Sequence, residues 1–317
     1  MQLGYALSSE EHAPLQLVRF AQHAEEAGFD FASISDHYHP WVDQQGHSAF
    51  VWCTIGGIAQ ATSRLRLGTG VTCPIMRIHP AIIAQAAATA AAMMPDRFFL
   101  GVGSGENLNE HILGAHWPEP DVRLEMLEEA VEVIRLLWTG GEQSHRGRYY
   151  TVEEARLYTL PAEPPPLFVA ADGEQAAGLA ARVGDGLIGV SPDRELIQQF
   201  AGAGGRRKPR YGQVTVCYAG READARRIAF EWWPTSGLKG NLSWEIKKPG
   251  LFEQAVKTLR EEDVCESIVC GPDPKRHLEA IRRFVDAGYD HVYVHQVGPD
   301  QEGFFRFYAE RILPELR

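Results

Sequence analysis

The chain has 317 residues, of which 44% are hydrophobic and 23% are charged, so it is expected to form a globular protein with a large core. Its 42 acidic residues outnumber its 31 lysines and arginines, and the formal net charge of −11 argues against nucleic acid or an anionic membrane as a partner. The sequence has no apolar run that could span a bilayer, no secretion signal and no CxxC pair among its five cysteines. These features predict a cytoplasmic protein with reduced thiols.

Short apolar runs recur along the chain and are typical of buried parallel strands. The expected strands are residues 2–7, 31–34, 66–71, 98–102, 167–170, 187–190, 213–218 and 291–294. The expected helices are residues 14–27, 49–62, 79–94, 121–139, 174–183, 193–201, 221–231, 274–287 and 303–313. Eight strands alternating with helices predict an α/β protein with a (β/α)8 TIM barrel, formed as a single domain over residues 1–317. An open doubly wound sheet is the alternative.

Three of the helix-to-strand junctions share a glycine where the helix is expected to end. Gly28, Gly184 and Gly288 each precede an acidic residue and an apolar run. Glycine favours this position because it can adopt the left-handed conformation that ends many helices.

Two stretches interrupt the alternation of strands and helices. Residues 140–166 have the composition of a hairpin followed by a proline-rich connection, and residues 232–262 form a second long insertion. Long insertions in compact domains are commonly functional, so we expect both to cover one end of the barrel.

Polar side chains and glycines gather where the expected strands end. Residues 35–41 (SDHYHPW) follow the second strand, and residues 101–107 (GVGSGEN) lie at the end of the fourth. In a TIM barrel these positions meet at the carboxyl end of the strands, where active sites are built. The pattern predicts His37 and Glu106 as an acid/base pair beside Asp36.

Two other interpretations of these motifs are less favoured. Residues 101–105 resemble a dinucleotide-binding fingerprint, but Glu106 occupies the place where that motif needs glycine. His37 and His39 form an HxH pair of the kind that binds zinc in barrel hydrolases. Because no histidine follows at the ends of the fourth to sixth strands, we predict no metal site, with a metal-dependent hydrolase as the alternative.

The stretches Ser-Asp-His-x-x-Pro-Trp (35–41) and Gly-Val-Gly-x-Gly-Glu-x-Leu-Asn-Glu (101–110) resemble the luciferase-like family of flavin and deazaflavin oxidoreductases. Within this family the chain is similar, over nearly its whole length, to the F420-dependent glucose-6-phosphate dehydrogenase group. The resemblance implies a homodimeric enzyme that transfers a hydride between a small alcohol or carbonyl compound and coenzyme F420. An FMN-dependent monooxygenase and a non-catalytic cofactor-binding relative are the alternatives on the same fold.

The resemblance also implies roles for individual residues. His37 is expected to carry the proton of the substrate hydroxyl, and Glu106 to manage the proton of the cofactor ring. Trp41 should form a wall of the pocket and steady the reaction intermediate, with support from Glu10. The expected cofactor contacts are Asp36, Gly70, Val71, Ser104, Gly105, Asn107, Asn109, Ala170, Ala171, Asp172 and Gly173.

Two further expectations concern the backbone of this cofactor site. The peptide bond between Gly70 and Val71 is expected to be cis. Asp172 stands where a turn that holds phosphate would favour glycine, and it could instead cap the helix that begins at residue 174.

Some positions depart from the sugar-phosphate members of the group. Val190, Asp193 and Gln254 stand where those members have threonine, lysine and lysine. An aspartate repels a phosphate dianion, so we expect an uncharged alcohol or ketone to be a better substrate than glucose 6-phosphate. Lysines within residues 239–248 could compensate.

Overall fold

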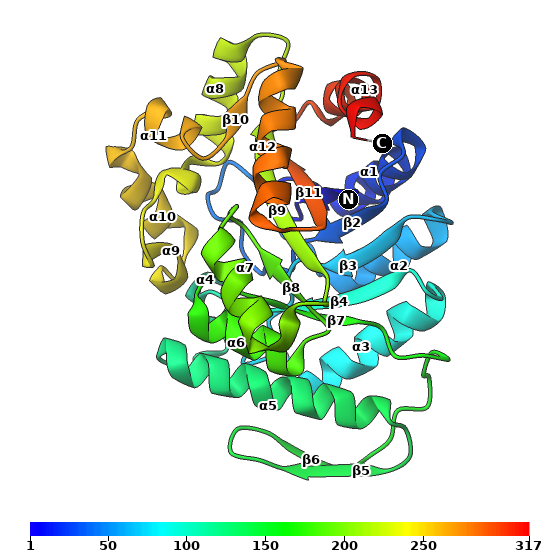
Figure 1. Cartoon of the computed structure of the whole chain (residues 1–317). Helices are drawn as coiled ribbons and strands as arrows, with labels where there is room; N and C mark the ends of the chain where they lie inside the picture. Colours follow the sequence, from blue (N-terminus) through cyan, green and yellow to red (C-terminus); the bar gives the residue numbers. More distant parts are fainter. Residues whose placement is uncertain (317) are drawn as a thin grey trace.

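The structure is a computed structural model that describes residues 1–316 and contains a closed ring of eight parallel strands (Figure 1). The ring runs through β1 (Gln2–Leu7), β2 (Phe31–Ile34), β3 (Arg66–Thr69), β4 (Phe98–Val102), β7 (Leu167–Ala170), β8 (Gly186–Gly189), β9 (Arg210–Cys217) and β11 (His291–Gln296). Pairing of β11 with β1, and of β8 with β9, closes the ring. The predicted TIM barrel is confirmed, and the open sheet is wrong.

The nine expected helices are all present, with ends that differ by a few residues from the prediction. They are α1 (Pro14–Ala27), α2 (Val51–Ala61), α3 (Pro80–Met93), α5 (Pro120–Trp138), α6 (Glu174–Val183), α7 (Arg194–Phe200), α8 (Glu222–Trp232), α12 (Pro274–Ala287) and α13 (Gln301–Arg311). None of the helices within residues 1–316 combines the length and the apolar character that a membrane crossing requires.

The three junction glycines do not share one conformation. Gly28 (φ 95°) and Gly288 (φ 112°) are left-handed, as predicted. Gly184 has an extended backbone with φ −86°, so the prediction is wrong for this junction. Glycine is still required there because a Cβ would lie 2.8 Å from the carbonyl oxygen of Ala180.

Aromatic side chains fill the interior of the barrel below its carboxyl end. The cluster consists of Ala6, Phe31, Phe99, Phe168, Ile188, Tyr211 and Tyr293. Phe168 and Tyr211 are stacked with their ring centroids 4.8 Å apart. These rings fit because neighbouring strands present glycine toward them, as at Gly68, where a Cβ would overlap the ring of Phe99. The packed rings form a solid base beneath the mouth of the barrel.

The insertion at residues 140–166 does not cover the barrel mouth, and the expectation that it would is wrong. It forms a hairpin of β5 (Gln143–Arg146) and β6 (Thr151–Ala155) that lies along the outer side of α5 (Figure 1). The carboxylate of Glu129, on α5, accepts hydrogen bonds from the backbone N–H groups of Arg148, Tyr149 and Tyr150. This one carboxylate holds the tip of the hairpin on the helix.

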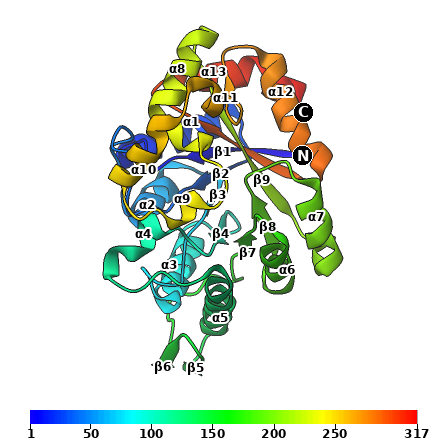
Figure 2. The same cartoon turned by 90° about the vertical axis from the view of Figure 1, so that its left-hand side faces the viewer.

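The second insertion does cover the mouth, as predicted (Figure 2). It contains a 3-10 turn (Pro234–Gly237), α9 (Leu242–Glu245), α10 (Pro249–Ala255) and α11 (Glu261–Cys265). We call residues 232–262 the roof. The two-residue strand β10 (Val269–Cys270) follows and pairs with the end of β9. This strand was not predicted, because two residues are too few to show the alternation of apolar and polar side chains that marks a strand.

Candidate active site

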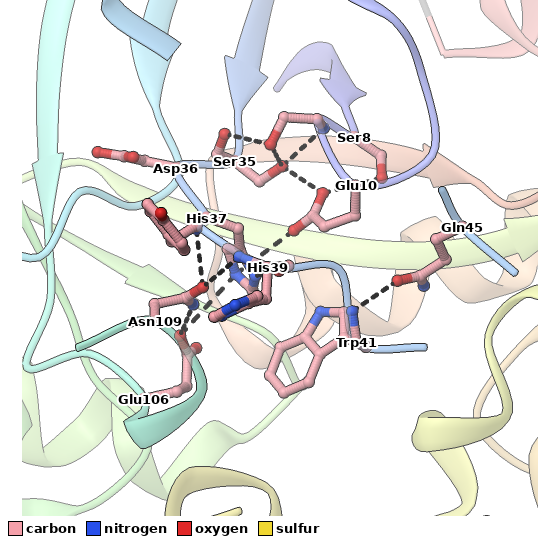
Figure 3. A network of polar contacts seen from close by, with 12 residues as sticks. Ser8, Glu10, Ser35, Asp36, His37, His39, Trp41, Gln45, Glu106 and Asn109 are labelled. Atoms are coloured by element: carbon pink, nitrogen blue, oxygen red, sulfur yellow. Dashed lines mark hydrogen bonds and ion pairs between the residues drawn. The ribbon is translucent and has the colours of Figure 1, made fainter. Parts of the chain in front are cut away.

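The four side chains predicted to be catalytic meet at the carboxyl end of the barrel (Figure 3). Nε2 of His37 lies 3.4 Å from Oε1 of Glu10 and 3.8 Å from Oε2 of Glu106. The rings of His37 and Trp41 are 5.2 Å apart between centroids. The loops after β1, β2 and β4 therefore bring together one imidazole, two carboxyl groups and one indole.

Glu10 is held as a buried carboxylate. Its Oε2 accepts hydrogen bonds from the hydroxyls of Ser35 (2.6 Å) and Ser8 (3.0 Å). Burial alone would raise the pKa of Glu10, but the charge of His37 and the Ser35 hydrogen bond outweigh it and lower that pKa below its ordinary value. Glu10 therefore stabilises the protonated form of His37. Neither serine was predicted as a site residue, although Ser35 lies within the quoted motif.

The orientation of His37 follows from its second ring nitrogen. Nδ1 lies 3.3 Å from the carbonyl oxygen of His39, and a carbonyl can only accept, so Nδ1 carries the hydrogen in the neutral ring. Nε2 then keeps its lone pair and faces the two carboxyl groups. This is the protonation state that a general base needs.

Asn109 links the two sequence motifs of the site. Its Oδ1 accepts from the backbone N–H groups of Tyr38 (2.9 Å) and His39 (3.2 Å), and its Nδ2 donates to Oε2 of Glu106 (3.1 Å). The side chain is buried, and these contacts position both His37 and Glu106. Its predicted contact with a cofactor stays a prediction.

Asp36 points into the protein, where buried partners surround it. Its Oδ1 lies 2.8 Å from the guanidinium of Arg77, and its Oδ2 accepts from the hydroxyl of Thr72 at 2.7 Å. Arg77 also lies 3.5 Å from Oε1 of Glu110. Thr72, Arg77 and Glu110 were not among the predicted site residues. Glu110 is the last residue of the motif at residues 101–110, whereas no motif in the sequence around Arg77 marks it as a site residue.

Glycines shape the floor of the site. The Gly70–Val71 peptide bond is cis, as predicted. A Cβ at Gly70 would overlap the Ser33 hydroxyl, and a Cβ at Gly103 would lie 2.7 Å from Cγ2 of Val71. Gly105 has φ 75°, and a Cβ there would lie 2.5 Å from the Cys73 sulfur. These three positions require glycine because a Cβ would meet neighbouring protein atoms.

The turn at residues 170–173 ends in an open helix N-terminus. Gly173 is the N-cap of α6, no side chain caps this helix, and a Cβ at Gly173 would have no atom within 4 Å. The suggested capping role of Asp172 is therefore wrong. Ala171 is buried, while Asp172 and Gly173 are exposed. The uncapped N–H groups and the helix dipole suit an anionic group.

Two residues at the rim connect the site to the roof. Asn107 donates from Nδ2 to the carbonyl oxygen of Glu245 at 2.9 Å, and Arg123 lies 3.2 Å from the carboxylate of Glu245. Ser104, between the floor glycines, is half-buried. The predicted cofactor roles of Asn107 and Ser104 stay predictions.

The second histidine of the HxH pair has a structural partner. Nδ1 of His39 lies 2.9 Å from the carbonyl oxygen of Leu108, and its ring stacks on that of His111. Within residues 1–316, no three His, Cys, Asp or Glu side chains are grouped as a metal site would require.

Comparison with known proteins relates this geometry to a family. The family model described as luciferase-like monooxygenase matches residues 1–291. The chain is 35% identical to an F420-dependent glucose-6-phosphate dehydrogenase of Nakamurella multipartita, over 100% of this chain and 97% of the relative. It is 39% identical to an F420-dependent hydroxymycolic acid dehydrogenase of Mycobacterium tuberculosis, over 99% of this chain and 88% of the relative.

A solved structure is similar over the same length. It is an F420-dependent secondary alcohol dehydrogenase in complex with an F420-acetone adduct, with a TM-score of 0.93 and 30% identity. The similarity covers 100% of this chain and 99% of that structure.

Glu110 generates a testable prediction about stability. Burial raises its pKa to about 7, whereas in the unfolded chain a glutamate titrates near 4.3. The unfolded state therefore releases this proton first, and the stability that protonated Glu110 contributes is lost as pH rises from about 4.5 to 7. We expect the free energy of unfolding to fall by about 2–4 kcal/mol more over this range in the wild type than in Glu110→Gln.

Urea unfolding at a series of pH values measures this difference. Glu129→Gln is the matched control, because hydrogen bonds lower the pKa of Glu129 although burial opposes them, so its effect lies below this pH range. Parallel curves for the wild type and Glu110→Gln between pH 5 and 7 would contradict the prediction.

Proposed function

Because the chain belongs to the luciferase-like monooxygenase family, as its two motifs predict, we propose that it is an F420-dependent oxidoreductase acting on a small alcohol or ketone. The observation that carries the proposal is the position of His37, whose Nε2 lies between the carboxyl groups of Glu10 and Glu106 at the edge of the glycine floor. Relatives named as F420-dependent cover the whole chain and favour F420 over FMN.

The floor and the turn before α6 fit such a cofactor. We expect the planar ring to lie against the backbone at Gly70 and Gly105, which carry no side chain, and beside Val71. An anionic tail needs N–H donors, which the residue 170–173 turn and the start of α6 supply. Ser104 and Asn107 lie on either side of Gly105 in the sequence, before the turn at residues 170–173. When bound, the deazaflavin supplies the acceptor or donor of the hydride.

His37 acts as the proton acceptor of the substrate hydroxyl in the direction of oxidation. Its Nδ1–H is held by the His39 carbonyl, and its Nε2 accepts the proton. The carboxylate of Glu10 then stabilises the imidazolium. In the direction of reduction, the same imidazolium returns the proton to the carbonyl oxygen.

Glu106 serves the cofactor side of the reaction. Its side chain is 27% exposed, so it is accessible to a ligand at the carboxyl end of the barrel. The amide of Asn109 fixes one of its oxygens and leaves the other to exchange a proton with the ring.

Trp41 forms an apolar wall beside His37. Its indole packs between His37 and Phe252, with both ring centroids 5.2 Å away. Phe252 is fully buried in the roof. The two rings exclude water from His37 and give the substrate an apolar wall.

The proposed substrate is uncharged. Asp193 uses its carboxylate to cap α7, accepting from the backbone N–H groups of Glu195 and Leu196. Val190 is 66% exposed at the same rim, and neither residue can pair with a phosphate. Lys239 is paired with Glu266 at 3.1 Å. The rim therefore favours a neutral alcohol over a sugar phosphate.

The proposed assembly is a homodimer in the cytoplasm. An apolar groove between α2 and α3 is lined by residues that include Phe50, Trp52, Ile78, Ile82 and Met93. Phe50 and Ile82 are each 55% exposed, and no lining residue is charged, so an equally uncharged surface fits it. The same face of a second copy supplies that surface. All five cysteines are free, which suits a reducing compartment.

Removing the imidazole should slow the reaction without releasing the cofactor. We expect His37→Ala to bind F420 with nearly wild-type affinity and to lower turnover roughly 10²–10⁴-fold, the usual loss for a general acid/base. Fluorescence titration measures binding and rapid-mixing absorbance measures turnover. The matched control is His39→Asn, which changes a neighbouring histidine that faces away from Glu10. Turnover of His37→Ala within a few-fold of the wild type would exclude His37 as the proton carrier.

Substrate preference tests the neutral-pocket proposal. Purified protein titrated with F420 and with FMN should bind F420 more tightly. With F420 bound, secondary alcohols should be oxidised at least a hundredfold more efficiently than glucose 6-phosphate, because a phosphate lacks its charge-assisted contacts. Tighter binding of FMN would contradict the cofactor proposal. Efficient oxidation of glucose 6-phosphate would contradict the substrate proposal.

The dimer is tested at the groove. Ile82→Glu places a charge in the uncharged face and should convert a dimer to a monomer in sedimentation equilibrium. Leu15→Glu, at an exposed leucine on α1 outside this groove, is the control and should leave the mass unchanged. A wild type that is monomeric at micromolar concentration would refute the assembly.

A further inference from the structure

A second carboxylate–histidine pair lies beside the one formed by Glu10 and His37. Nε2 of His295 lies 2.8 Å from Oε2 of Glu11, and Oε1 of Glu11 accepts from the N–H of Gly298 at 2.8 Å. The side chain of Glu11 is fully buried and that of His295 is 3% exposed. Neither residue has a part in the chemistry described above.

His295 faces the inside of the barrel. Side chains alternate along a strand, and Tyr293, two residues earlier on β11, belongs to the aromatic cluster that fills the interior. His295 therefore lies on the same face, one step closer to the mouth, in register with Thr215 of β9. The ring of Trp233, at the start of the roof, packs edge-on against it at 4.4 Å.

Glu11 fixes which nitrogen of His295 carries the hydrogen. An ionised carboxylate only accepts hydrogen bonds, so Nε2 is the donor and Nδ1 keeps the lone pair in the neutral ring. Within residues 1–316, Nδ1 makes no hydrogen bond. Nδ1 is not one of the side-chain atoms that are closed off from solvent, so this acceptor on the inner face of the barrel is accessible to a group that enters the site.

The two histidines are placed for one ligand. Glu10 and Glu11 are consecutive, so their Cα atoms are about 3.8 Å apart. Each holds one imidazole. His37 and His295 therefore lie on adjoining parts of the mouth, after β2 and on β11, which both flank β1.

We propose that His295 accepts a hydrogen bond from a second hydroxyl group of the substrate, so that the preferred substrate is a diol or another polyhydroxy alcohol. This inference rests on the proposed function. The reacting carbon loses a hydride to the cofactor, and its hydroxyl loses a proton to His37, giving a ketone. The second hydroxyl stays intact and donates to Nδ1 of His295. A substrate with one hydroxyl cannot make this second hydrogen bond.

The test compares matched alcohols. For the wild type with F420, kcat/KM should be about tenfold or more higher for propane-1,2-diol or butane-1,3-diol than for propan-2-ol, which is the usual effect of one buried hydrogen bond. His295→Phe keeps a ring against Trp233 but has no acceptor. Its diol-to-monool ratio should fall to about one, mainly through KM for the diols.

Two further variants keep the test decisive. In Glu11→Gln, one side-chain oxygen replaces the two that accept from His295 and Gly298, so the hydrogen of His295 is no longer held on Nε2. The diol-to-monool ratio of kcat/KM should then lie between those of the wild type and His295→Phe. This variant tests the inference even if His295→Phe folds poorly. His291→Asn, at the amino end of the same strand, is the matched control and should keep the wild-type ratio.

The outcomes separate the inference from the proposed function. Equal kcat/KM for diols and monools in the wild type, or an unchanged ratio in His295→Phe, would overturn the inference and leave the proposed function standing. No F420-linked oxidation or reduction of any alcohol or ketone pair would overturn the proposed function, and this inference with it.

Discussion

The loops of the site depend on one buried ion pair, between Asp36 after β2 and Arg77 after β3. Arg77 also reaches Glu110 after β4, so buried polar groups join three consecutive strand ends. Removing one member would leave a buried charge without its partner, a change that typically destabilises a protein strongly. Since His37 directly follows Asp36 in the chain, the ion pair also determines where the imidazole stands.

The carboxyl groups of the site differ in their partners. Asp36 is compensated by Arg77 and Thr72 inside the protein. Within residues 1–316, Glu10 and Glu106 have no arginine or lysine partner, and both face His37. The two carboxyl groups lie 3.4 Å and 3.8 Å from Nε2 of His37. The arrangement therefore suits a residue that takes a proton from an alcohol and keeps it while the hydride moves.

The roof gives the mouth its apolar character and its boundary. Phe252 packs on Trp41, and Glu245 is held by Asn107 and Arg123 from below. The pocket wall is thus assembled from segments separated by about two hundred residues in the sequence. Substrate selection at the roof can change while the floor glycines and the His37 loop stay the same.

The barrel strands and their helices, the TIM barrel, the family, and His37 with the three residues around it could be predicted from the sequence, because periodicity and strand-end motifs are local. The pairing of distant buried groups, such as Arg77 with Asp36 and Glu11 with His295, is visible only in the folded structure. It also placed the residue 140–166 hairpin on α5, away from the mouth, through Glu129. Such pairings depend on which chain segments meet in space, and no local pattern records that.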